Sequence, residues 1–364
     1  MNLKNISLRN FRNFLFAEAD LDSGVNVFLG ENAQGKTNLL EAIYYLSCGK
    51  SFRTRYEKDL ICFEKNDAEI RGVSHARERE FDIRICLNRG KRKKVTINNL
   101  SPKKIDATNI LNTVCFTPED LNLIRAGEAE RRRFLNNVIA SLRPKYSQAI
   151  TEYTKTLEQK TKILQLSDER PDLLKALPEF TTRLCQIGAL IIRYRAYFIE
   201  RLSEQANVAQ WELTNGKEKL EIKYKTVSSI TDVMASTQDI FNQLMEHAEQ
   251  HKSAELACGQ CLTGPHKDSL IINLGGKLLK SFGSQGQTRT AALALKIAEL
   301  EITKQEINDE PILLLDDVLS ELDETRQNCV LNRITNGQVI ITCCEEPKSL
   351  HMSKVIKIKN GEII

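Results

Sequence analysis

The sequence lacks any long hydrophobic run. Its 364 residues contain no apolar stretch that approaches the roughly 18–20 residues needed for a membrane-spanning helix. Its first residues, MNLKNISLRNFRNF, have no apolar core of the kind found in a secretory signal. Internal repeats and low-complexity segments are also absent. We therefore expect a cytoplasmic protein with no membrane partner.

The sequence also has little excess charge of either sign. Its 52 Lys and Arg residues and 48 Asp and Glu residues give a net charge of +4, which is only weak evidence for a nucleic-acid partner. Hydrophobic residues make up 41% and charged residues 27%, as is ordinary for a globular protein. The length is sufficient for a large core divided between two domains or lobes.

Cysteine is abundant, but its spacing does not define a metal site. Several of the ten cysteines lie in apolar stretches, such as Cys115 in NTVCF and Cys343 and Cys344 in VIITCC, and buried free thiols in a reducing cytosol explain these best. Cys258 and Cys261 form a C-x-x-C pair without a second pair or a thioredoxin-like pattern beside it. Unpaired structural thiols are the preferred interpretation, and metal or redox chemistry is the alternative. The five histidines show no metal-ligand spacing either.

A glycine-rich turn is the strongest motif. Residues 30–37, GENAQGKT, fit G-x-x-x-x-G-K-[ST] in full, after the apolar run VNVF and before the helical pattern NLLEAIYYL. Backbone amides of such a loop converge on phosphates, and the helix N-terminus adds positive potential. Lys36 would bridge the β- and γ-phosphates of ATP, and the Thr37 hydroxyl would bind Mg²⁺. The expected nucleotide contacts are Gly30, Glu31, Asn32, Ala33, Gln34, Gly35, Lys36, Thr37 and Asn38.

A second motif supplies the acids that such a loop requires. The all-apolar run 312–315 predicts a buried strand, and Asp316 and Asp317 follow at its C-terminal end. Asp316 would hold Mg²⁺ through water, and Asp317 would orient the attacking water. The alternative is that the two acids merely cap a helix. The motifs lie 316 − 36 = 280 residues apart, so a large segment is inserted between them.

A third motif precedes a long amphipathic helix in the stretch SFGSQGQTRTAALALKIAELEI. Ser284 and Gly286 lie at the expected N-terminus of that helix, where backbone amides favour anions. An ordinary N-cap without a ligand is the alternative.

The pattern changes twice along the chain. The first hundred residues are mostly strand-like, the segment from Glu128 to about Gln210 is mostly helical, and strand patterns return near residue 265. Apolar residues in the second half of the helical segment follow a heptad: Phe180, Leu184, Ile187, Ile191, Tyr194 and Phe198. Two antiparallel helices in a short coiled-coil arm are expected, with two core helices of a helical lobe as the alternative. The predicted division is 1–125, 126–264 and 265–364.

Together these motifs resemble the ABC-type ATPases, and within them the SMC-like branch and its RecF family of bacterial recombination mediators. The similarity extends along nearly the whole chain, over these segments: NFRNF, GENAQGKTNLLEAIYYLS, FTPEDLNLI, GEAERRRFLN, GPHKDSL, GSQGQTRT and LLLDDVLSELD. It implies an α/β fold, an ABC-type P-loop ATPase head with an inserted helical lobe. The family commonly has an Arg and a second Asp where this sequence has Lys267 and Ser269. Lys keeps the charge but loses the planar fork of Arg.

The resemblance also implies a mechanism. Each ATP site would combine Lys36, Thr37, Asp316 and Asp317 of one subunit with Ser284 and Gly286 of the other, so that ATP drives formation of a homodimer. It further places Arg12 and Asn13 near the nucleotide. Relatives often have Glu at the position of Asp317. The shorter Asp implies slow hydrolysis, with the nucleotide acting as a switch.

The partners implied by the resemblance are DNA at single-strand gaps, RecR-like and RecO-like mediators, and RecA, which the protein would help to load. Cations aimed at phosphates would bind the DNA. The basic candidates come from three runs: Lys50, Arg53 and Arg55; Arg89, Lys91, Arg92, Lys93 and Lys94; and Arg131, Arg132 and Arg133.

Two other functions use the same nucleotide motif. An ATPase subunit of a membrane transporter would usually have a histidine in the switch region, where this sequence has Cys343 and Cys344 after Thr342, and it would lack the long insertion. A small-molecule kinase would have no use for the S-x-G-Q element. Both are therefore less favoured than an ATP-switched DNA-binding protein.

Overall fold

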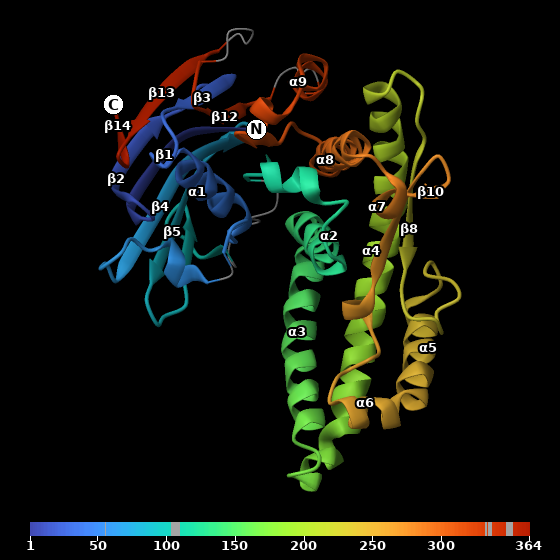
Figure 1. The fold of residues 1–364 in the computed structure, drawn as a ribbon. Coiled ribbons are helices and arrows are strands. Elements are labelled where there is room, and N and C mark those ends of the chain that lie inside the picture. Colours follow the sequence, from blue (N-terminus) through green and yellow to red (C-terminus); the bar gives the residue numbers. More distant parts are fainter. Residues whose placement is uncertain (55, 103–109, 332, 334–336, 347–351) are drawn as a thin grey trace. The chain divides into compact units, whose positions relative to one another are not determined.

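The chain forms two compact units in the computed structural model, which describes all residues except 55, 103–109, 332, 334–336 and 347–351 (Figure 1). The first unit, here called the ATPase unit, comprises residues 1–120 and 300–364. The second, here called the helical unit, comprises residues 121–299. The structure places residues 265–299 with the helical unit, whereas the three-part division at residues 125 and 265 stays a prediction.

A six-stranded sheet forms the base of the ATPase unit, in the order β14-β13-β3-β12-β11-β7. Every neighbouring pair is parallel except β13 and β14. The inner strands are almost wholly apolar, as expected for a parallel sheet buried on both faces. The strands are β3 (Val25–Leu29), β7 (Thr113–Phe116), β11 (Ile312–Asp316), β12 (Val339–Cys343), β13 (Lys354–Lys359) and β14 (Glu362–Ile363).

The register brings three strand ends together. Asp316 at the end of β11 pairs with Thr342 of β12. Next to it, Cys343 of β12 pairs with Leu29, the last residue of β3. The glycine-rich loop therefore begins beside the two acids, although 280 residues separate Lys36 from Asp316 in the sequence.

A second, antiparallel sheet of five strands completes the ATPase unit, in the order β2-β1-β4-β5-β6. Its strands are β1 (Asn2–Phe11), β2 (Phe14–Asp20), β4 (Asp67–Ala76), β5 (Arg79–Asn88) and β6 (Lys94–Ile97). Helix α1 (Lys36–Cys48) lies within one continuous core that contains side chains of both sheets, such as Leu8, Ile70, Leu314 and Ile340. These strands agree with the strand-like pattern of the first hundred residues, and β11 agrees with the buried strand expected at 312–315.

The helical unit is built around one long helix, α4 (Leu177–Leu213). The other helices are α2 (Glu128–Leu142), α3 (Pro144–Gln165), α5 (Thr237–Gln250), α6 (Lys252–Cys258) and α7 (Leu279–Phe282). A three-stranded antiparallel sheet accompanies them, with β8 (Leu220–Lys225), β9 (Ser269–Leu274) and β10 (Lys277–Leu278). Figure 1 shows α3 and α4 lying side by side in opposite directions.

Helix α4 buries two stripes, not one. The heptad stripe is buried at Leu184, Ile187, Ile191 and Phe198, and α4 contacts α3. A second stripe, with Cys185, Ala189 and Ile192, packs in one cluster with Ile240, Leu244 and Ala248 of α5. The expectation of a two-helix coiled-coil arm was therefore incomplete, because α4 is the central helix of a packed lobe.

Two further helices follow in the chain, α8 (Gln285–Ile307), which begins in the helical unit and ends in the ATPase unit, and α9 (Glu324–Leu331). None of the helices in the described part of the chain is long and apolar enough to cross a membrane.

Candidate nucleotide-binding site

The glycine-rich loop connects the end of β3 to the start of α1. Gly35 adopts φ 118°, and a Cβ atom there would lie 2.7 Å from the Asn13 side chain, so the turn requires glycine. A Cβ atom on Gly30 would lie 2.3 Å from the carbonyl oxygen of Ile358. The Lys36 ammonium donates to the carbonyl oxygens of Gly30, at 2.6 Å, and Glu31, at 2.8 Å. The loop thus holds its lysine at the helix N-terminus expected of a phosphate site.

The C-terminal strands support this loop from outside. The turn between β13 and β14 donates two backbone N–H groups to Gln34: Asn360 to its side-chain oxygen at 2.5 Å, and Gly361 to its carbonyl oxygen at 3.0 Å. The Asn13 amide also donates to the Gln34 carbonyl, at 3.1 Å. Asn13 therefore contacts the loop, and its contact with the nucleotide stays a prediction.

The acids at the end of β11 lie beside the first turn of α1. The Thr37 hydroxyl donates to Oδ1 of Asp316 at 2.8 Å, and the Thr342 hydroxyl donates to the same oxygen at 2.8 Å. Burial raises the pKa of Asp316, and these two hydrogen bonds and the charge of Arg53 oppose the shift. Mg²⁺ prefers oxygen ligands such as hydroxyl and carboxylate groups, so Thr37 and Asp316 could bind such an ion.

Asp317 lies in a different environment from its neighbour. It is half-buried, and its backbone takes the left-handed conformation, with φ 51°. Its N–H donates to the Thr342 hydroxyl oxygen at 2.9 Å. Thr342 therefore contacts both acids, one through its hydroxyl hydrogen and one through its oxygen. This role of Thr342 was not predicted, although a polar residue near the end of an apolar strand was a usable signal.

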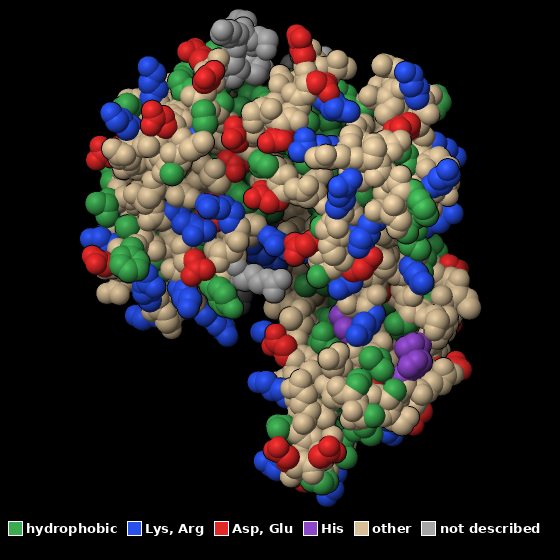
Figure 2. Space-filling model, viewed as in Figure 1, with side chains coloured by type: hydrophobic (Ala, Val, Ile, Leu, Met, Phe, Trp, Pro, Cys, Tyr) green, Lys and Arg blue, Asp and Glu red, His purple; other side chains and the backbone are tan. Residues whose placement is uncertain are grey.

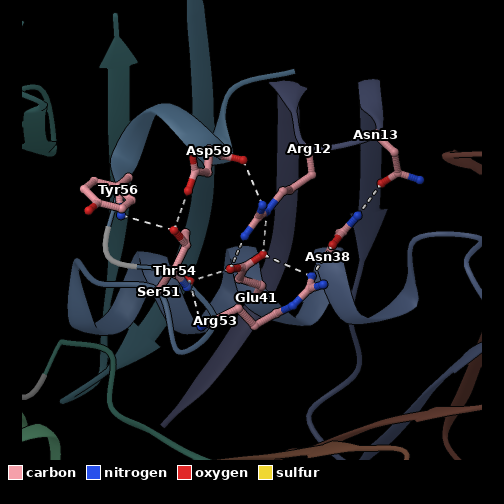
Figure 3. Close-up of polar contacts among 9 residues, drawn as sticks. All are labelled: Arg12, Asn13, Asn38, Glu41, Ser51, Arg53, Thr54, Tyr56 and Asp59. Carbon is pink, nitrogen blue, oxygen red and sulfur yellow. Dashed lines mark hydrogen bonds and ion pairs between the residues drawn. The ribbon is translucent and has the colours of Figure 1, made fainter. Parts of the chain in front are cut away.

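Arg12 is held by a buried carboxylate of α1 (Figure 3). Its Nε and Nη2 atoms donate to the two oxygens of Glu41 at 2.9 and 2.8 Å, and Nη1 donates to the carbonyl oxygen of Asp59 at 2.8 Å. Arg53 also reaches Glu41 and bonds to Asn38. Glu41 is fully buried, and no motif of the sequence pointed to it.

The S-x-G-Q element begins α8 in the helical unit. The Gln287 N–H donates to the Ser284 hydroxyl oxygen at 3.2 Å, and the Ser284 N–H donates to the Gln287 side chain at 3.0 Å. This reciprocal pair is a capping box. Ser284, Gln285 and Gly286 are all exposed. The segment therefore forms an ordinary helix cap and still leaves Ser284 and Gly286 exposed, as an anion site would require.

The candidate DNA-binding cations separate into exposed and internal groups. Lys50, Arg53, Arg89, Lys91, Arg92 and Lys94 are exposed. Figure 2 shows Lys and Arg side chains gathered over the part of the ATPase unit where Figure 1 places β4 and β5. Arg55 lies outside the described residues.

Two of the candidates have internal roles. The Lys93 ammonium lies 2.7 Å from a Glu57 oxygen, 3.2 Å from the Tyr45 hydroxyl and over the Tyr45 ring. Arg131 is 4% exposed and donates to the carbonyl oxygens of Ile124 and Ala126. The basic runs suggested surface cations here, but both side chains stabilise their own unit, so we remove them from the DNA candidates.

The other two arginines of the second run are half-buried. Arg132 donates to the carbonyl oxygen of Asp268 at 2.7 Å. Arg133 pairs with Glu130 one helical turn away, at 3.4 Å. Both therefore contribute to packing within the helical unit, whatever else they contact.

The C-x-x-C pair belongs to no cluster of metal-binding side chains among the described residues. All ten cysteines are free thiols, Cys258 exposed and Cys261 buried. Among the described residues no group of three or more His, Cys, Asp or Glu side chains could hold a metal ion. His266 donates from Nε2 to the Cys261 carbonyl oxygen at 2.9 Å, so its Nδ1 accepts from the Tyr153 hydroxyl at 2.7 Å.

Comparisons with known proteins agree on one family. The model of the RecF/RecN/SMC N-terminal domain matches residues 2–363. The DNA replication and repair protein RecF of Agathobacter rectalis is 38% identical over 100% of this chain and 99% of its own length. The RecF protein of Clostridium novyi is 40% identical over 100% and 99%.

Solved structures show the same fold. The recombination mediator protein RecF-ATP of the RecFOR pathway superposes with a TM-score of 0.90 at 33% identity, covering 100% of this chain and 96% of that one. An Smc head bound to the C-winged helix domain of ScpA superposes with a TM-score of 0.55 at 15% identity, which shows similarity of fold alone.

Proposed function

Because the chain belongs to the RecF/RecN/SMC N-terminal domain family, and within it to the RecF proteins, we propose that it is an ATP-switched DNA-binding protein of recombinational repair and replication restart. Its ABC-type ATPase fold is the framework for this function. The observation that carries the proposal is the meeting of Lys36, Thr37 and Asp316 at one edge of the parallel sheet.

We propose that the nucleotide of this site is ATP. Backbone amides of the loop and the N-terminus of α1 would surround the phosphates, and Lys36 would exchange its bonds to Gly30 and Glu31 for phosphate oxygens. Thr37 and Asp316 would hold Mg²⁺, which neutralises charge on the triphosphate. The similar structure described as RecF-ATP supports this choice of nucleotide.

Hydrolysis would be slow. Asp317 is the acid beside the Mg²⁺-binding carboxylate, and we assign it the orientation of the attacking water. Its side chain is one methylene shorter than Glu, so it reaches the water less well. Slow hydrolysis suits a protein that uses bound ATP as a signal of its state.

A second subunit would complete the site. Ser284 and Gly286 are exposed at the N-terminus of α8, where backbone amides and a hydroxyl favour an anion. We propose that they bind the γ-phosphate held by the partner's P-loop. ATP would then join two subunits, and ADP, which lacks that phosphate, would release them.

DNA would be held by the exposed cations of the ATPase unit that the sequence singled out: Lys50, Arg53, Arg89, Lys91, Arg92 and Lys94. We further propose the partners of the RecFOR pathway, RecR-like and RecO-like mediators, with single-strand gaps as the DNA target and loading of RecA as the outcome. The description of the similar structure as a recombination mediator in that pathway supports this part.

Two binding measurements on the purified protein test the function. Lys36→Ala should abolish ATP binding or nearly so, because it removes the ammonium that reaches the phosphates; unchanged ATP affinity would contradict the assignment.

DNA affinity should fall steeply with salt, because released counterions contribute much of it.

A charge-reversal variant locates the DNA surface. Reversing Lys91, Arg92 and Lys94 to Glu, and leaving the internal Lys93 intact, should lower both the affinity and the salt slope. Reversal of the exposed lysines Lys145, Lys155 and Lys175 in the helical unit is the matched control. An equal loss in both variants would show that only net charge matters.

A further inference from the structure

Gln287, the last residue of the S-x-G-Q element, uses both ends of its side-chain amide. Its Oε1 accepts the N–H of Ser284 at 3.0 Å, as part of the helix cap, and its Nε2 donates to Oε1 of Glu218 at 2.8 Å. Gln287 and Glu218 are half-buried, whereas Ser284 is exposed. The amide therefore connects the exposed start of α8 to a carboxylate that lies 69 residues earlier in the chain.

Glu218 belongs to the turn that follows α4. The Thr214 N–H and the Thr214 hydroxyl both donate to the Gln210 carbonyl oxygen, at 3.0 and 2.8 Å. The Glu218 N–H donates to the Thr214 hydroxyl oxygen at 3.3 Å. On the other side of the turn, the Leu220 N–H donates to the Asn207 side-chain oxygen at 3.1 Å. These contacts attach the backbone around Glu218 to the last turns of α4.

The second oxygen of the Glu218 carboxylate is bound by α4 itself. The Gln210 amide donates from Nε2 to Oε2 of Glu218 at 2.9 Å. Gln210 is completely buried, and its Oε1 has no hydrogen-bond partner among the described residues. Burial of an amide is unfavourable unless it forms hydrogen bonds, so the bond to Glu218 determines how the Gln210 side chain is oriented.

The carboxylate of Glu218 determines which way the Gln287 amide faces. An ionised carboxylate only accepts hydrogen bonds, so the NH₂ group of Gln287 must face Glu218 and its oxygen must face the Ser284 N–H. The Ser284 hydroxyl oxygen accepts the Gln287 N–H, so its own hydrogen can donate to an oxygen of a ligand. The contacts thus leave an exposed hydroxyl in the role that phosphate binding requires.

From these contacts we propose that Glu218 is a positioning residue of the composite ATP site. It holds Gln287, and through Gln287 the Ser284 hydroxyl, in the orientation that binds the γ-phosphate of the ATP on the partner subunit. The proposal rests on the proposed function and extends the site beyond the S-x-G-Q element. It also connects binding of the γ-phosphate to Gln210, and thus to the C-terminal end of α4.

The test is dimerisation of the full chain with ATP and Mg²⁺, measured by light scattering over a range of protein concentrations. Glu218→Ala should weaken dimerisation by about a hundredfold, because loss of a charge-assisted hydrogen bond costs about tenfold at each of two equivalent sites. Binding of a fluorescent ATP analogue to the monomer should remain near that of the wild type, since the P-loop is intact.

Glu218→Gln distinguishes orientation from charge. A glutamine at this position can still accept from Gln287 through its amide oxygen. Its NH₂ group can donate to Gln210 once the Gln210 amide turns over, which would give a partner to the oxygen that has none among the described residues. Dimerisation of Glu218→Gln should therefore stay within about tenfold of the wild type. A loss as large as in Glu218→Ala would contradict positioning through hydrogen bonds.

Glu221→Ala is the matched control. Glu221 is an acid of β8 three residues after Glu218, and it pairs with Lys223 at 3.5 Å. Its removal should leave dimerisation unchanged. If Glu218→Ala dimerises like the wild type and Ser284→Asp does not, the positioning role is overturned and the composite site stands. If both variants dimerise, the composite site fails as well, so the two failures are distinguishable.

An exchange of the two side chains tests the same contact if melting temperatures show that Glu218→Ala does not fold. Gln287→Glu keeps the helix cap, because Glu also accepts the N–H of Ser284 in a capping box. It places two carboxylates side by side, and it should abolish dimerisation. Adding Glu218→Gln restores a donor between them, and it should recover at least about tenfold of the lost affinity. No recovery would contradict the proposed role of Glu218.

Discussion

At the scale of single residues, Thr342 contacts two consecutive acids whose environments differ. Its hydroxyl bonds to the buried Asp316 and to the backbone of Asp317. Asp316 faces Thr37, whereas Asp317 is half-buried. A buried acid beside a threonine suits metal binding, and its accessible neighbour suits contact with water.

Asp317→Asn should therefore slow ATP hydrolysis by about 10²-fold or more, because an amide is a poor base. ATP affinity should remain near that of the wild type, since Lys36, Thr37 and Asp316 are intact. Steady-state hydrolysis and equilibrium binding check the two parts separately. Glu324→Gln, an exposed acid at the start of α9, is the control. Wild-type hydrolysis in Asp317→Asn would assign the water to another residue.

Cys344 reports on the same site. It is exposed, and its sulfur lies 3.5 Å from the Lys36 ammonium and 3.1 Å from the Asn32 side-chain oxygen. Alkylation of Cys344 by iodoacetamide should block ATP binding, because the adduct would crowd Lys36. Bound ATP should protect this thiol, measured by mass spectrometry of its peptide, and Cys344→Ser should make ATP binding resistant to the reagent. Equal labelling with and without ATP would be inconsistent with the site.

The residues that the sequence predicted are those whose roles follow from local backbone geometry. Lys36 and Thr37 belong to a short loop whose spacing defines its shape, and Asp316 ends an apolar strand. Glu41 was missed because its partners come from elsewhere in the chain: Arg12 is 29 residues away. The internal contacts of Lys93 were not predicted for the same reason, since its partners Tyr45 and Glu57 are distant in sequence.

At the scale of elements, the segment between α6 and β9 is held in place by buried hydrogen bonds and an ion pair. The Arg195 guanidinium donates to a carboxylate oxygen of Asp268 and, at 2.7 Å, to the Pro265 carbonyl oxygen. His266 lies between them in sequence, and burial lowers its pKa from 6.5 to about 4. The neutral ring is the form that accepts from Tyr153.

This shift predicts a pH dependence of stability. A histidine whose pKa is lower in the folded protein stabilises it above about pH 6.5, and the contribution is lost as the pH falls toward 4. Between pH 7 and pH 5 the free energy of unfolding should fall by about 2 kcal/mol from this residue. His266→Gln should show a shallower dependence.

Trp211 provides the measurement, because it is the only tryptophan in the sequence and lies in the same unit. Its fluorescence during urea unfolding at the two pH values compares wild type with His266→Gln. The same pH dependence in both proteins would mean that His266 does not titrate as its burial implies.

The positions of helices and strands could be predicted where the hydrophobic pattern was strong. The way in which these elements pack together could not be predicted. The apolar run 312–315 located β11, and the heptad located α4. The second buried stripe of α4 escaped notice because it contains small residues such as Cys185 and Ala189, and its partner is α5, some 50 residues later. Periodicity identifies one buried face readily, but it does not say how many neighbours a helix has.

At the scale of the whole molecule, the motifs divide between the two units. The P-loop and both acids lie in the ATPase unit, whereas Ser284 and Gly286 lie in the helical unit. In the proposed mechanism the ATPase unit binds the ATP of its own subunit, and the helical unit contacts the ATP that is bound to the partner subunit. ATP binding, dimerisation and DNA binding are then coupled through a shared γ-phosphate.

The state of association with and without ATP tests this mechanism most directly. Ser284→Asp is the informative variant, because Asp keeps the N-cap of α8 while placing an anion where the partner's γ-phosphate is expected. Light scattering with ATP and Mg²⁺ should show dimers of the wild type and monomers of Ser284→Asp, both binding ATP to their intact P-loops. A wild type that stays monomeric with ATP, or a variant that still dimerises, would contradict the composite site.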